Sequence, residues 1–382
     1  MKRPGLLIGI FGSFLFVQAA QADWTPAKRI TWTSGMSINS DMAIDSTNTI
    51  HVVWEDDTPG NREIYCRRST DGGTTWIAAK RLTWTSGESI GAAIAVDSDN
   101  HIHVVWYDDT PGNHEIYYRK GLDGGTTWDA AKRLTWTSGE SSFPQLAIDS
   151  SGNLQVLWKD NTLGNYEIYH KSSTDGGTTW SGAQRLTWTS ITLEPPAMGI
   201  DSGNIIHVAW ADLTSGNIEI YYGNSEDGGA TWSAAKRLTW TSGSSYHPAI
   251  AIDSGNTIHV VWNDDTPSNA EIFHKSSADG GTTWSDARRL TWTTGKSGFP
   301  AIAIDAGDSL HVVWQDDTQV NQEIYYKRSA DGGTTWSGAQ RLTWTTGASW
   351  VPSLARDAND LIHITWDDLT PGNYEIYYKN GH

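Results

Sequence analysis

The chain has 382 residues, a formal net charge of −17 at pH 7, 22 tryptophans and a single cysteine. The many aromatic residues exclude a largely disordered chain, and one cysteine cannot form an internal disulfide. The acidic balance argues against nucleic acid or an anionic membrane surface as a partner.

The first segment of the chain is typical of an export signal. Two basic residues precede an apolar run over residues 6–17, and Ala20-Gln21-Ala22 offers a cleavage site between small residues. The apolar run is too short to cross a bilayer. We therefore predict a signal peptide over residues 1–22 and a mature chain that begins near Asp23. Such a protein would be secreted to the extracellular space or the periplasm.

The rest of the chain repeats every 52 residues. One unit contains four strand-like pieces, PAIAID, IHVVWND, EIYYK and TTWSGAQRLTW, joined by the turn sequences DSGN, DDTPGN and DGGTTW. Four short strands in a unit of about 50 residues predict one blade of a β-propeller. The string Arg-(Leu/Ile)-Thr-Trp marks seven such units, beginning at Arg29, Arg81, Arg133, Arg185, Arg237, Arg289 and Arg341.

The two ends of the repeat region complement each other. The last unit stops at EIYYKNGH, after three strands, and Trp24 lies 52 residues before Trp76, so the N-terminal segment supplies the missing fourth strand. A closed ring removes the open edge that would invite aggregation. We therefore predict an all-β fold in which residues 23–382 form a single seven-bladed β-propeller of four-stranded antiparallel blades.

The turn between the third and fourth strands carries a recurring motif. Six units read Ser-x-Asp-x-Gly-x-Thr-Trp, with departures at Gly121 and Ala230. The motif resembles the Asp box, or BNR repeat, of sialidase-like propellers, and the resemblance implies a fold element away from the substrate face. The aspartate can accept hydrogen bonds from the N–H groups of its own turn, and paired glycines tolerate positive φ. We expect a structural role for Asp71, Asp123, Asp175, Asp227, Asp279 and Asp331.

The other face of the ring is the predicted ligand face, because the resemblance to sialidases places the substrate there. Of the 22 tryptophans, 21 fall into three columns that recur in all seven units, and Trp350 alone stands outside them. Trp350 is therefore expected to be exposed. Arg356 replaces an aliphatic residue on an inner strand, and burial there would require a carboxylate, a channel or a ligand. The candidate ligand-binding residues are Trp350, Tyr246, His247, Phe299, Phe143, Arg356, Tyr107 and Asp367.

Signals of catalysis are weak. The resemblance implies three substrate-binding arginines and a Tyr–Glu pair, but the Glu63/Tyr65 pattern recurs around the ring, and no arginine stands at the expected loop positions. A histidine column on the second strands is interpreted as core. No catalytic residue, metal ligand or cofactor is assigned, although calcium is left open for the oxygen-rich loop from Asp56 to Glu63.

These observations favour a monomeric, lectin-like protein that binds a glycan or glycoconjugate without cleaving it, inserts into no membrane and binds no nucleic acid. Two alternatives remain: a divergent exo-sialidase or other glycoside hydrolase, and a protein-interaction scaffold. The ligand face also leaves a choice between one asymmetric site, repeated sites between blades that use the Trp84 and Asp108 columns, and neutral drift of exposed loops. Cys66 stands where other units have tyrosine or histidine and is interpreted as a substitution.

Overall fold

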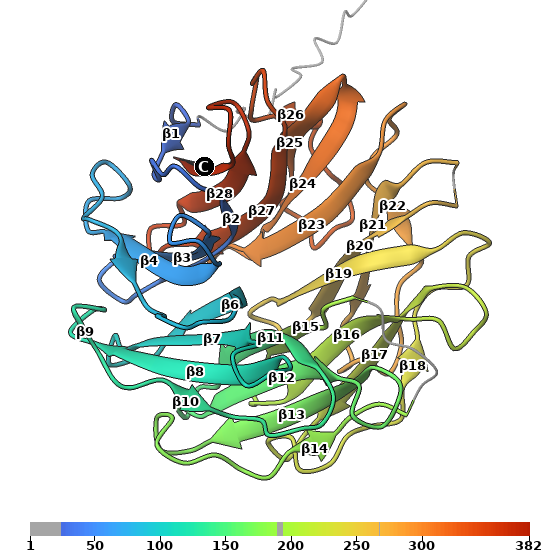
Figure 1. Ribbon diagram of the computed structural model, residues 1–382. Helices are drawn as coiled ribbons and strands as arrows, with labels where there is room; N and C mark the ends of the chain where they lie inside the picture. Colours follow the sequence, from blue (N-terminus) through green and yellow to red (C-terminus); the bar gives the residue numbers. More distant parts are fainter. Residues whose placement is uncertain (1–23, 189–193, 267) are drawn as a thin grey trace, which may run out of the picture.

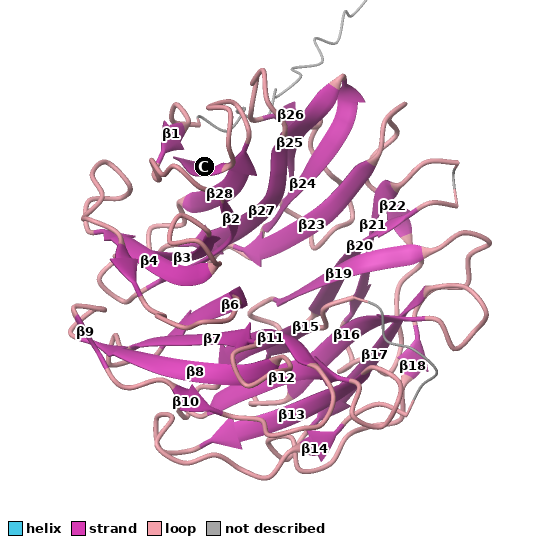
Figure 2. Cartoon of the chain, viewed as in Figure 1, coloured by secondary structure: helices cyan, strands magenta, loops and turns pink. Residues whose placement is uncertain are grey.

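The computed structural model describes residues 24–188, 194–266 and 268–382, which form a ring of seven β-sheets (Figure 1). The predicted signal peptide lies outside the described residues. Strands and loops make up the described part of the chain (Figure 2), in which no helix could span a membrane. The prediction of a seven-bladed propeller with four antiparallel strands per blade is confirmed.

The strands of blades 1 to 7, in order, are β2 (Ser37–Ile44), β3 (Ile50–Asp56), β4 (Glu63–Ser69) and β5 (Lys80–Arg81); β6 (Ser89–Val96), β7 (Ile102–Asp108), β8 (Glu115–Leu122), β9 (Thr127–Trp128) and β10 (Lys132–Arg133); β11 (Ser141–Ile148), β12 (Leu154–Asp160), β13 (Glu167–Ser173) and β14 (Gln184–Arg185); β15 (Ala197–Ile200), β16 (Ile206–Asp212), β17 (Glu219–Ser225) and β18 (Lys236–Arg237); β19 (Ser245–Ile252), β20 (Ile258–Asp264), β21 (Glu271–Ser277) and β22 (Arg288–Arg289); β23 (Ser297–Ile304), β24 (Leu310–Gln319), β25 (Asn321–Ser329) and β26 (Gln340–Arg341); and β27 (Ser349–Arg356), β28 (Ile362–Asp368) and β29 (Glu375–Gly381) with β1 (Lys28–Arg29). The first strand of each blade lies toward the middle of the ring (Figure 1).

The ring closes where the N-terminal strand completes the last blade. Strand β1 pairs antiparallel with β29, with Lys28 opposite Tyr378 and Arg29 opposite Tyr377. Ile30 donates from its N–H to the Ile376 carbonyl (2.8 Å) and is fully buried. The predicted closure is confirmed, and the outer edge of β29 is covered.

The fourth strand of each blade is shorter than the sequence suggests. In blade 1, Ile77 N donates to Arg68 O (3.1 Å). The backbone pairing with the third strand is then interrupted until β5 pairs with β4. Beyond β5, the Ile64 N–H binds the Thr83 hydroxyl (2.8 Å) in place of a backbone carbonyl. Irregular pairing of this kind is common on an edge strand.

Two of the tryptophan columns build the core between blades. Trp54 and its equivalents on the second strands are 1% exposed, and Trp54 stacks on Tyr65 of its own blade (6.0 Å between centroids). Trp76 packs edge-on against Tyr378 of the preceding blade (5.2 Å). Aromatic pairs in these geometries add stabilisation beyond the area they bury.

The repeated glutamate and histidine columns have structural partners. Glu63 is fully buried and accepts from Arg81 Nη2 (2.7 Å), and the same pair recurs in all seven blades. A buried carboxylate needs such a partner. His51 is buried and bonds Asp45 of the adjacent turn (3.0 Å). The repetition of these residues is thus explained by the scaffold.

The Asp box is a self-bonded turn. Asp175 accepts from the Thr179 N–H (2.8 Å), the Thr179 hydroxyl (2.6 Å) and the Ser173 hydroxyl (2.8 Å), while the Gly177 N–H donates to Ser173 (2.9 Å). Both glycines have positive φ, 65° at Gly176 and 84° at Gly177. The bonds to Asp175 hold its pKa at about 2. The second box lacks the serine, and its aspartate, Asp123, instead adopts a positive φ of 50°.

Candidate functional site

A recurring β-bulge gives the first strands their special geometry. In six blades the pairing of the first and second strands shifts register near the start of the first strand. One residue there takes a left-handed conformation with φ between 45° and 62°, which costs a non-glycine residue about 1–2 kcal/mol. Bulges re-aim side chains and are frequent beside active sites, where backbone strain also collects. The residues are Asn39, Gly91, Phe143, His247, Phe299 and Val351.

Blade 4 departs from this pattern because it has Pro195 at the equivalent position. The proline ring fixes φ near −65°, so the left-handed bulge cannot form. The first strand of this blade, β15, covers Ala197–Ile200 only. Glu194, one residue earlier, takes a place among the pocket residues.

The bulge positions of all seven blades meet in one pocket. Its volume is about 410 Å³, and it lies where the inner strands begin, on the predicted ligand face and opposite the Asp boxes. We call it the mouth pocket. Besides the six bulge residues and Pro195, its lining includes Ser40, Asp41, Glu55, Ala92, Ala93, Tyr107, Pro144, Gln145 and Glu194.

One wall of the mouth pocket is aromatic. Tyr107 and Phe143 lie 5.3 Å apart between ring centroids, and His247 and Phe299 lie 3.9 Å apart. Phe143 is 39% exposed. His247 is held by Asn263 (2.9 Å from Nδ1) and Glu194 (3.3 Å from Nε2). The wall therefore combines flat apolar faces with an oriented imidazole.

A second wall, formed by blades 1 and 7, is acidic and buried. Asn39 joins two of its carboxyl groups, because its N–H donates to Asp367 (2.9 Å) and its side-chain amide donates to Glu55 (3.2 Å). Glu55 also accepts from the Gly91 N–H (2.6 Å), and Asp367 Oδ1 has no hydrogen-bond partner among the described residues. Asp41 accepts from the Ile94 N–H (3.1 Å).

Burial sets the protonation of this wall. Desolvation raises the pKa of Asp41, of Glu55 and, well above its ordinary value, of Asp367. The charge of Glu55 raises the pKa of Asp367 further. A raised pKa favours the neutral carboxyl, which can donate as well as accept a hydrogen bond. The wall thus offers both donors and acceptors to a ligand.

Four of the predicted ligand-binding residues line the mouth pocket, namely Tyr107, Phe143, His247 and Phe299. Asp367 lies behind Asn39, bonded to it.

Three predicted residues lie elsewhere. Trp350 is half-buried instead of exposed and sits one residue before the bulge, so that Val351 lines the pocket. Tyr246 is half-buried beside His247, with ring centroids 6.2 Å apart. Arg356 is exposed, contrary to the expectation of a buried arginine, because β27 ends there. Its partner is Asp360 (3.0 Å).

Asn39, Asp41 and Glu55 are not among the residues that the sequence selected as candidates. Asp41 carries a usable signal, since the equivalent positions of the other units hold alanine, glutamine or serine. An acidic residue at one blade alone on an inner strand marks a departure from the blade plan.

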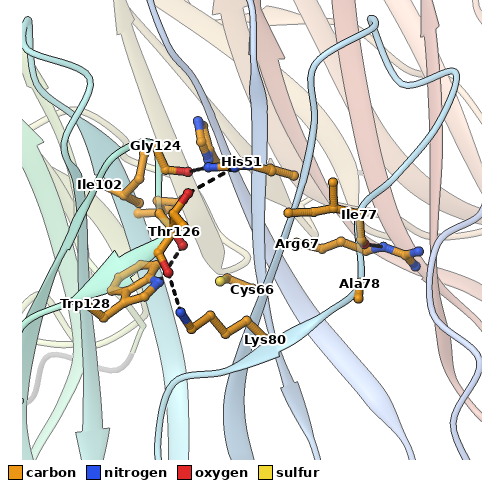
Figure 3. A pocket seen from close by; sticks show the side chains of 13 residues that line it. His51, Cys66, Arg67, Ile77, Ala78, Lys80, Ile102, Gly124, Thr126 and Trp128 are labelled. Atoms are coloured by element: carbon orange, nitrogen blue, oxygen red, sulfur yellow. Dashed lines mark hydrogen bonds between the residues drawn. The ribbon is translucent and has the colours of Figure 1, made fainter.

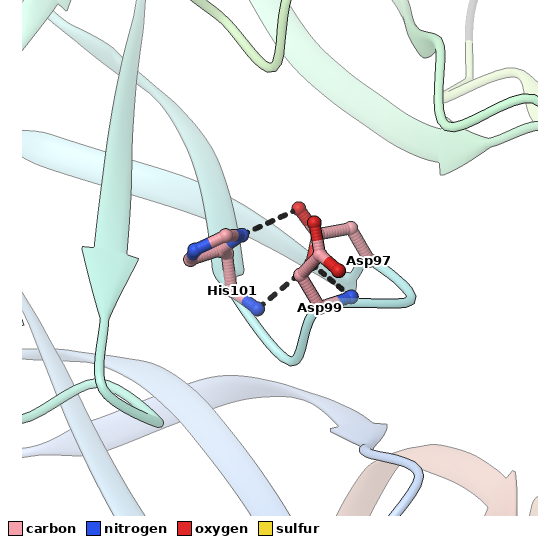
Figure 4. A group of neighbouring side chains, drawn as sticks. All are labelled: Asp97, Asp99 and His101. Atoms are coloured by element: carbon pink, nitrogen blue, oxygen red, sulfur yellow. Dashed lines mark hydrogen bonds and ion pairs between the residues drawn. The ribbon is translucent and has the colours of Figure 1, made fainter.

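The only acidic cluster with metal-like geometry among the described residues lies on the Asp-box face, in the turn between β6 and β7 (Figure 4). Asp97 there accepts from the Asp99 N–H (3.0 Å), the His101 N–H (2.8 Å) and the His101 ring (2.9 Å). The two backbone bonds recur in the equivalent turns of the other blades, whereas the bond from the His101 ring belongs to this turn. The loop considered for calcium is similarly occupied: Asp56 binds Ser37 (2.8 Å), and Glu63 binds Arg81.

A second cavity follows from the single cysteine. Where other blades place a tyrosine or histidine ring against the next Asp box, Cys66 leaves a space of about 180 Å³ beside Gly125 and Trp128 (Figure 3). Lys80 closes it by donating to the Thr126 carbonyl (2.6 Å). Burial raises the pKa of the Cys66 thiol to about 12, so the cavity holds a neutral thiol.

Residues 156–319 match the family model of the BNR repeat-like domain. No curated protein matches the sequence. A solved protein of unknown function from Dyadobacter fermentans is similar, with a TM-score of 0.62, 13% identity and coverage of 93% of this chain and 99% of that one. An ulvan lyase of a new polysaccharide lyase family is similar with a TM-score of 0.66 and 10% identity, and the match covers 92% of this chain and 95% of the lyase. A Hadza microbial sialidase is similar with a TM-score of 0.53 and 14% identity, and the match covers 86% of this chain and 76% of the sialidase.

At these identities the structural likeness shows the fold. The chain has the fold of a closed seven-bladed β-propeller with Asp boxes, a fold that the similar sialidase shares. The repeats over residues 156–319 are of the BNR type.

Proposed function

We propose that the chain is a glycan-binding protein and that the mouth pocket holds one sugar unit without cleaving it. The observation that carries the proposal is that the strained bulges bring one residue from each blade into a single pocket with an aromatic wall and a carboxyl wall. Sugars present an apolar C–H face and a rim of hydroxyls, which these two walls complement.

The charges of the pocket favour a neutral sugar. No arginine or lysine is present among the described residues that line it, whereas Asp41, Glu55 and Glu194 are. The nearest cations lie behind the lining, Lys159 against the Phe143 ring (4.7 Å) and Arg62 beside Glu55 (3.6 Å), whereas the three carboxyl groups that line the pocket disfavour the carboxylate of a sialic acid. The hydroxyls of a neutral sugar can donate to ionised carboxylates or accept from neutral ones.

The solved neighbours support a carbohydrate ligand. The similar ulvan lyase and sialidase are named for action on saccharides. Secretion is part of the proposal and rests on the segment over residues 1–22. Mass spectrometry of the protein recovered from the medium or periplasm of an expressing bacterium would identify an N-terminus near Asp23, and retention of residues 1–22 would contradict export by cleavage.

A second candidate, a glycoside hydrolase, is favoured by the pair Glu55 and Asp367. Both carboxyl groups bind Asn39, and burial raises the pKa of both. Most glycosidases use one carboxylic acid as proton donor and a second carboxylate as base or nucleophile. Asp367 would be the donor and Glu55 the second group. Turnover of a fluorogenic glycoside that is lost in both Glu55→Gln and Asp367→Asn would select this candidate.

A glycan array on the mature protein, followed by calorimetry on the strongest neutral ligand, tests the binding proposal. We expect one site, and Phe299→Ala should weaken binding by more than about 1 kcal/mol, or about fivefold in Kd, which is the threshold of an important contact. Arg356→Ala is the matched control, since this exposed side chain lies away from the pocket and should leave Kd unchanged. Equal Kd values for wild type and Phe299→Ala would reject the mouth pocket.

A further inference from the structure

The third tryptophan column is exposed on the outer rim of the ring. Each of these residues lies three positions after the end of a fourth strand and is between 63% and 71% exposed. Large exposed apolar groups in a regular arrangement mark interaction sites more often than isolated ones do. The residues are Trp32, Trp84, Trp136, Trp188, Trp240, Trp292 and Trp344.

Two cavities of the same construction lie beside these tryptophans. One, of about 290 Å³, contains Trp136, and the other, of about 370 Å³, contains Trp292. Their eleven lining positions correspond one to one, three repeats apart. Each cavity lies between the fourth strand of one blade and the second and third strands of the next, and we call such a place a rim site.

The glutamate-paired arginine of the fourth strand lies over the exposed tryptophan in all seven blades, and a second cation lies beside that tryptophan in six of them. Lys171 Nζ is 5.8 Å from the Trp136 ring, and Lys327 Nζ is 5.5 Å from the Trp292 ring. Both lysines line the cavities. The column consists of Arg67, Arg119, Lys171, Lys275, Lys327 and Lys379, with Gly223 in its place beside Trp188.

Carboxylates lie near some of these six cations without pairing directly with them, and the charges of Asp129 and Asp286 act on Arg119 and Lys275. Within the described ranges, none of them forms an ion pair with a carboxylate, although the chain is strongly acidic. Lys171 donates to the Leu134 carbonyl (2.6 Å), whereas the neighbouring Arg133 is paired with Glu115 (2.8 Å). An ammonium group with one carbonyl partner retains two further donors.

The buried side of the cavity adds an unused donor. Trp158 and Trp314 line the two cavities, are 1% exposed, and have indole Nε1 groups without a hydrogen-bond partner. Buried polar groups are normally paired. In blade 7 the equivalent Trp366 Nε1 donates to Asp368 (3.2 Å).

We propose that the rim sites bind an acidic saccharide, one unit per site, with the sugar's C–H face on the exposed tryptophan and its carboxylate or sulfate on the adjacent lysine or arginine. The inference goes beyond the mouth pocket, which it does not involve and which favours a neutral ligand. A ring of six such sites would hold a repeating anionic polymer by many weak contacts, and multivalent contacts of this kind raise avidity strongly.

The experiment uses the mature protein and a panel of uronate and sulfated oligosaccharides, each beside its neutral counterpart, such as oligogalacturonate beside its methyl ester. Calorimetry on the tightest anionic member should give a stoichiometry of six, matching the six cations. Affinity should fall at least about threefold between 50 and 500 mM NaCl, because salt screens charge pairs near a surface. The neutral counterpart should bind at least about tenfold more weakly, because it loses one charge-assisted hydrogen bond per site to a cation that is half-buried or buried.

The departure at Gly223 provides a gain-of-function variant. Gly223 has ordinary φ, and a Cβ there would meet its nearest atom, in Trp210, at 3.5 Å, so Gly223→Lys should fold. It should raise the stoichiometry to seven, and Lys275→Met should lower it to five. Phe299→Ala in the mouth pocket is the control and should leave the stoichiometry at six.

Several results would overturn the proposal. They are binding to no anionic member of the panel, equal binding of the neutral counterparts, and a stoichiometry of one that Phe299→Ala abolishes. An unchanged stoichiometry in Gly223→Lys would also overturn it, even if Lys275→Met did not fold. Loss of stability without change in binding for Trp136→Ala and Trp292→Ala would show that the rim tryptophans only cover the Arg–Glu pairs beneath them.

Discussion

The seam between the N-terminal strand and the last blade can be tested with one pair of single substitutions. Arg29 lies on β1, and its Nη2 donates to Glu375 Oε1 of β29 at 2.6 Å. Arg185 makes the same contact with Glu167 inside blade 3, at 2.7 Å. The two ion pairs have the same local geometry, but only the first joins the two ends of the chain.

Arg29→Ala leaves a carboxylate that is 0% exposed without its cation. Breaking a buried pair in this way costs about 3–5 kcal/mol. We expect the lower end, about 3 kcal/mol, because Arg29 is itself 25% exposed and Glu375 keeps bonds from Thr33 N (2.9 Å) and Asn373 Nδ2 (3.1 Å). Arg185→Ala should cost the same within about 1 kcal/mol, given the similar contacts.

Urea unfolding followed by tryptophan fluorescence measures both variants, and a lower midpoint at constant slope reports a loss of stability. The reasoning is refuted if Arg185→Ala is destabilised and Arg29→Ala is not, since β1 would then contribute nothing to the last blade. Removal of residues 24–32 should go further and produce aggregation, because it uncovers the edge of β29.

Three further predictions concern ionisable groups. Because the folded-state pKa of Asp175 is lowered to about 2, the stability it contributes is present above pH 4 and lost as the pH falls through 2. Asp175→Ala should therefore have a lower melting temperature than wild type at pH 7 and the same melting temperature at pH 2. Equal melting temperatures at pH 7 would contradict the turn's role. Because the folded-state pKa of Asp367 is raised, its ionisation disfavours folding as the pH rises. Asp367→Asn should therefore have a higher melting temperature than wild type at pH 8 but not at pH 3. A lower melting temperature of the variant at pH 8 would refute this prediction. The pKa of Cys66, about 12 against an ordinary 9, leaves about a thousandfold less thiolate at pH 8; Ellman's reagent should react with Cys66 in the folded protein more than about a hundredfold slower than in urea, and a rate equal to that in urea would show the thiol to be open.

The repeat made most of the fold predictable. A strict period of 52 residues, turn sequences at fixed places and complementary ends determine the blade count, the strand order and the seam. The choice of the ligand face came from the resemblance to sialidases and not from the repeat, and it stays a prediction. What repetition cannot show is where a side chain points within a variable loop.

That limit explains the differences at the site. A register shift turns Val351 and not Trp350 toward the pocket, whereas in blade 4, which has Pro195 at the bulge position, both Glu194 and Pro195 line it. Arg356 looked buried because its column is aliphatic, but it stands at the last position of β27, where the side chain reaches solvent and Asp360. The sequence offered the Trp84 column only as one possible set of repeated sites, because a column that repeats in every blade can equally belong to the core.

A crystal structure of the mature protein soaked with the strongest neutral glycan from the array tests the central claim most directly. The account predicts one sugar ring in the mouth pocket, with its C–H face on Phe299 or Phe143 and a hydroxyl bonded to Glu55. Sugar density on the Asp-box face, or an empty mouth pocket beside an occupied site elsewhere, would contradict it.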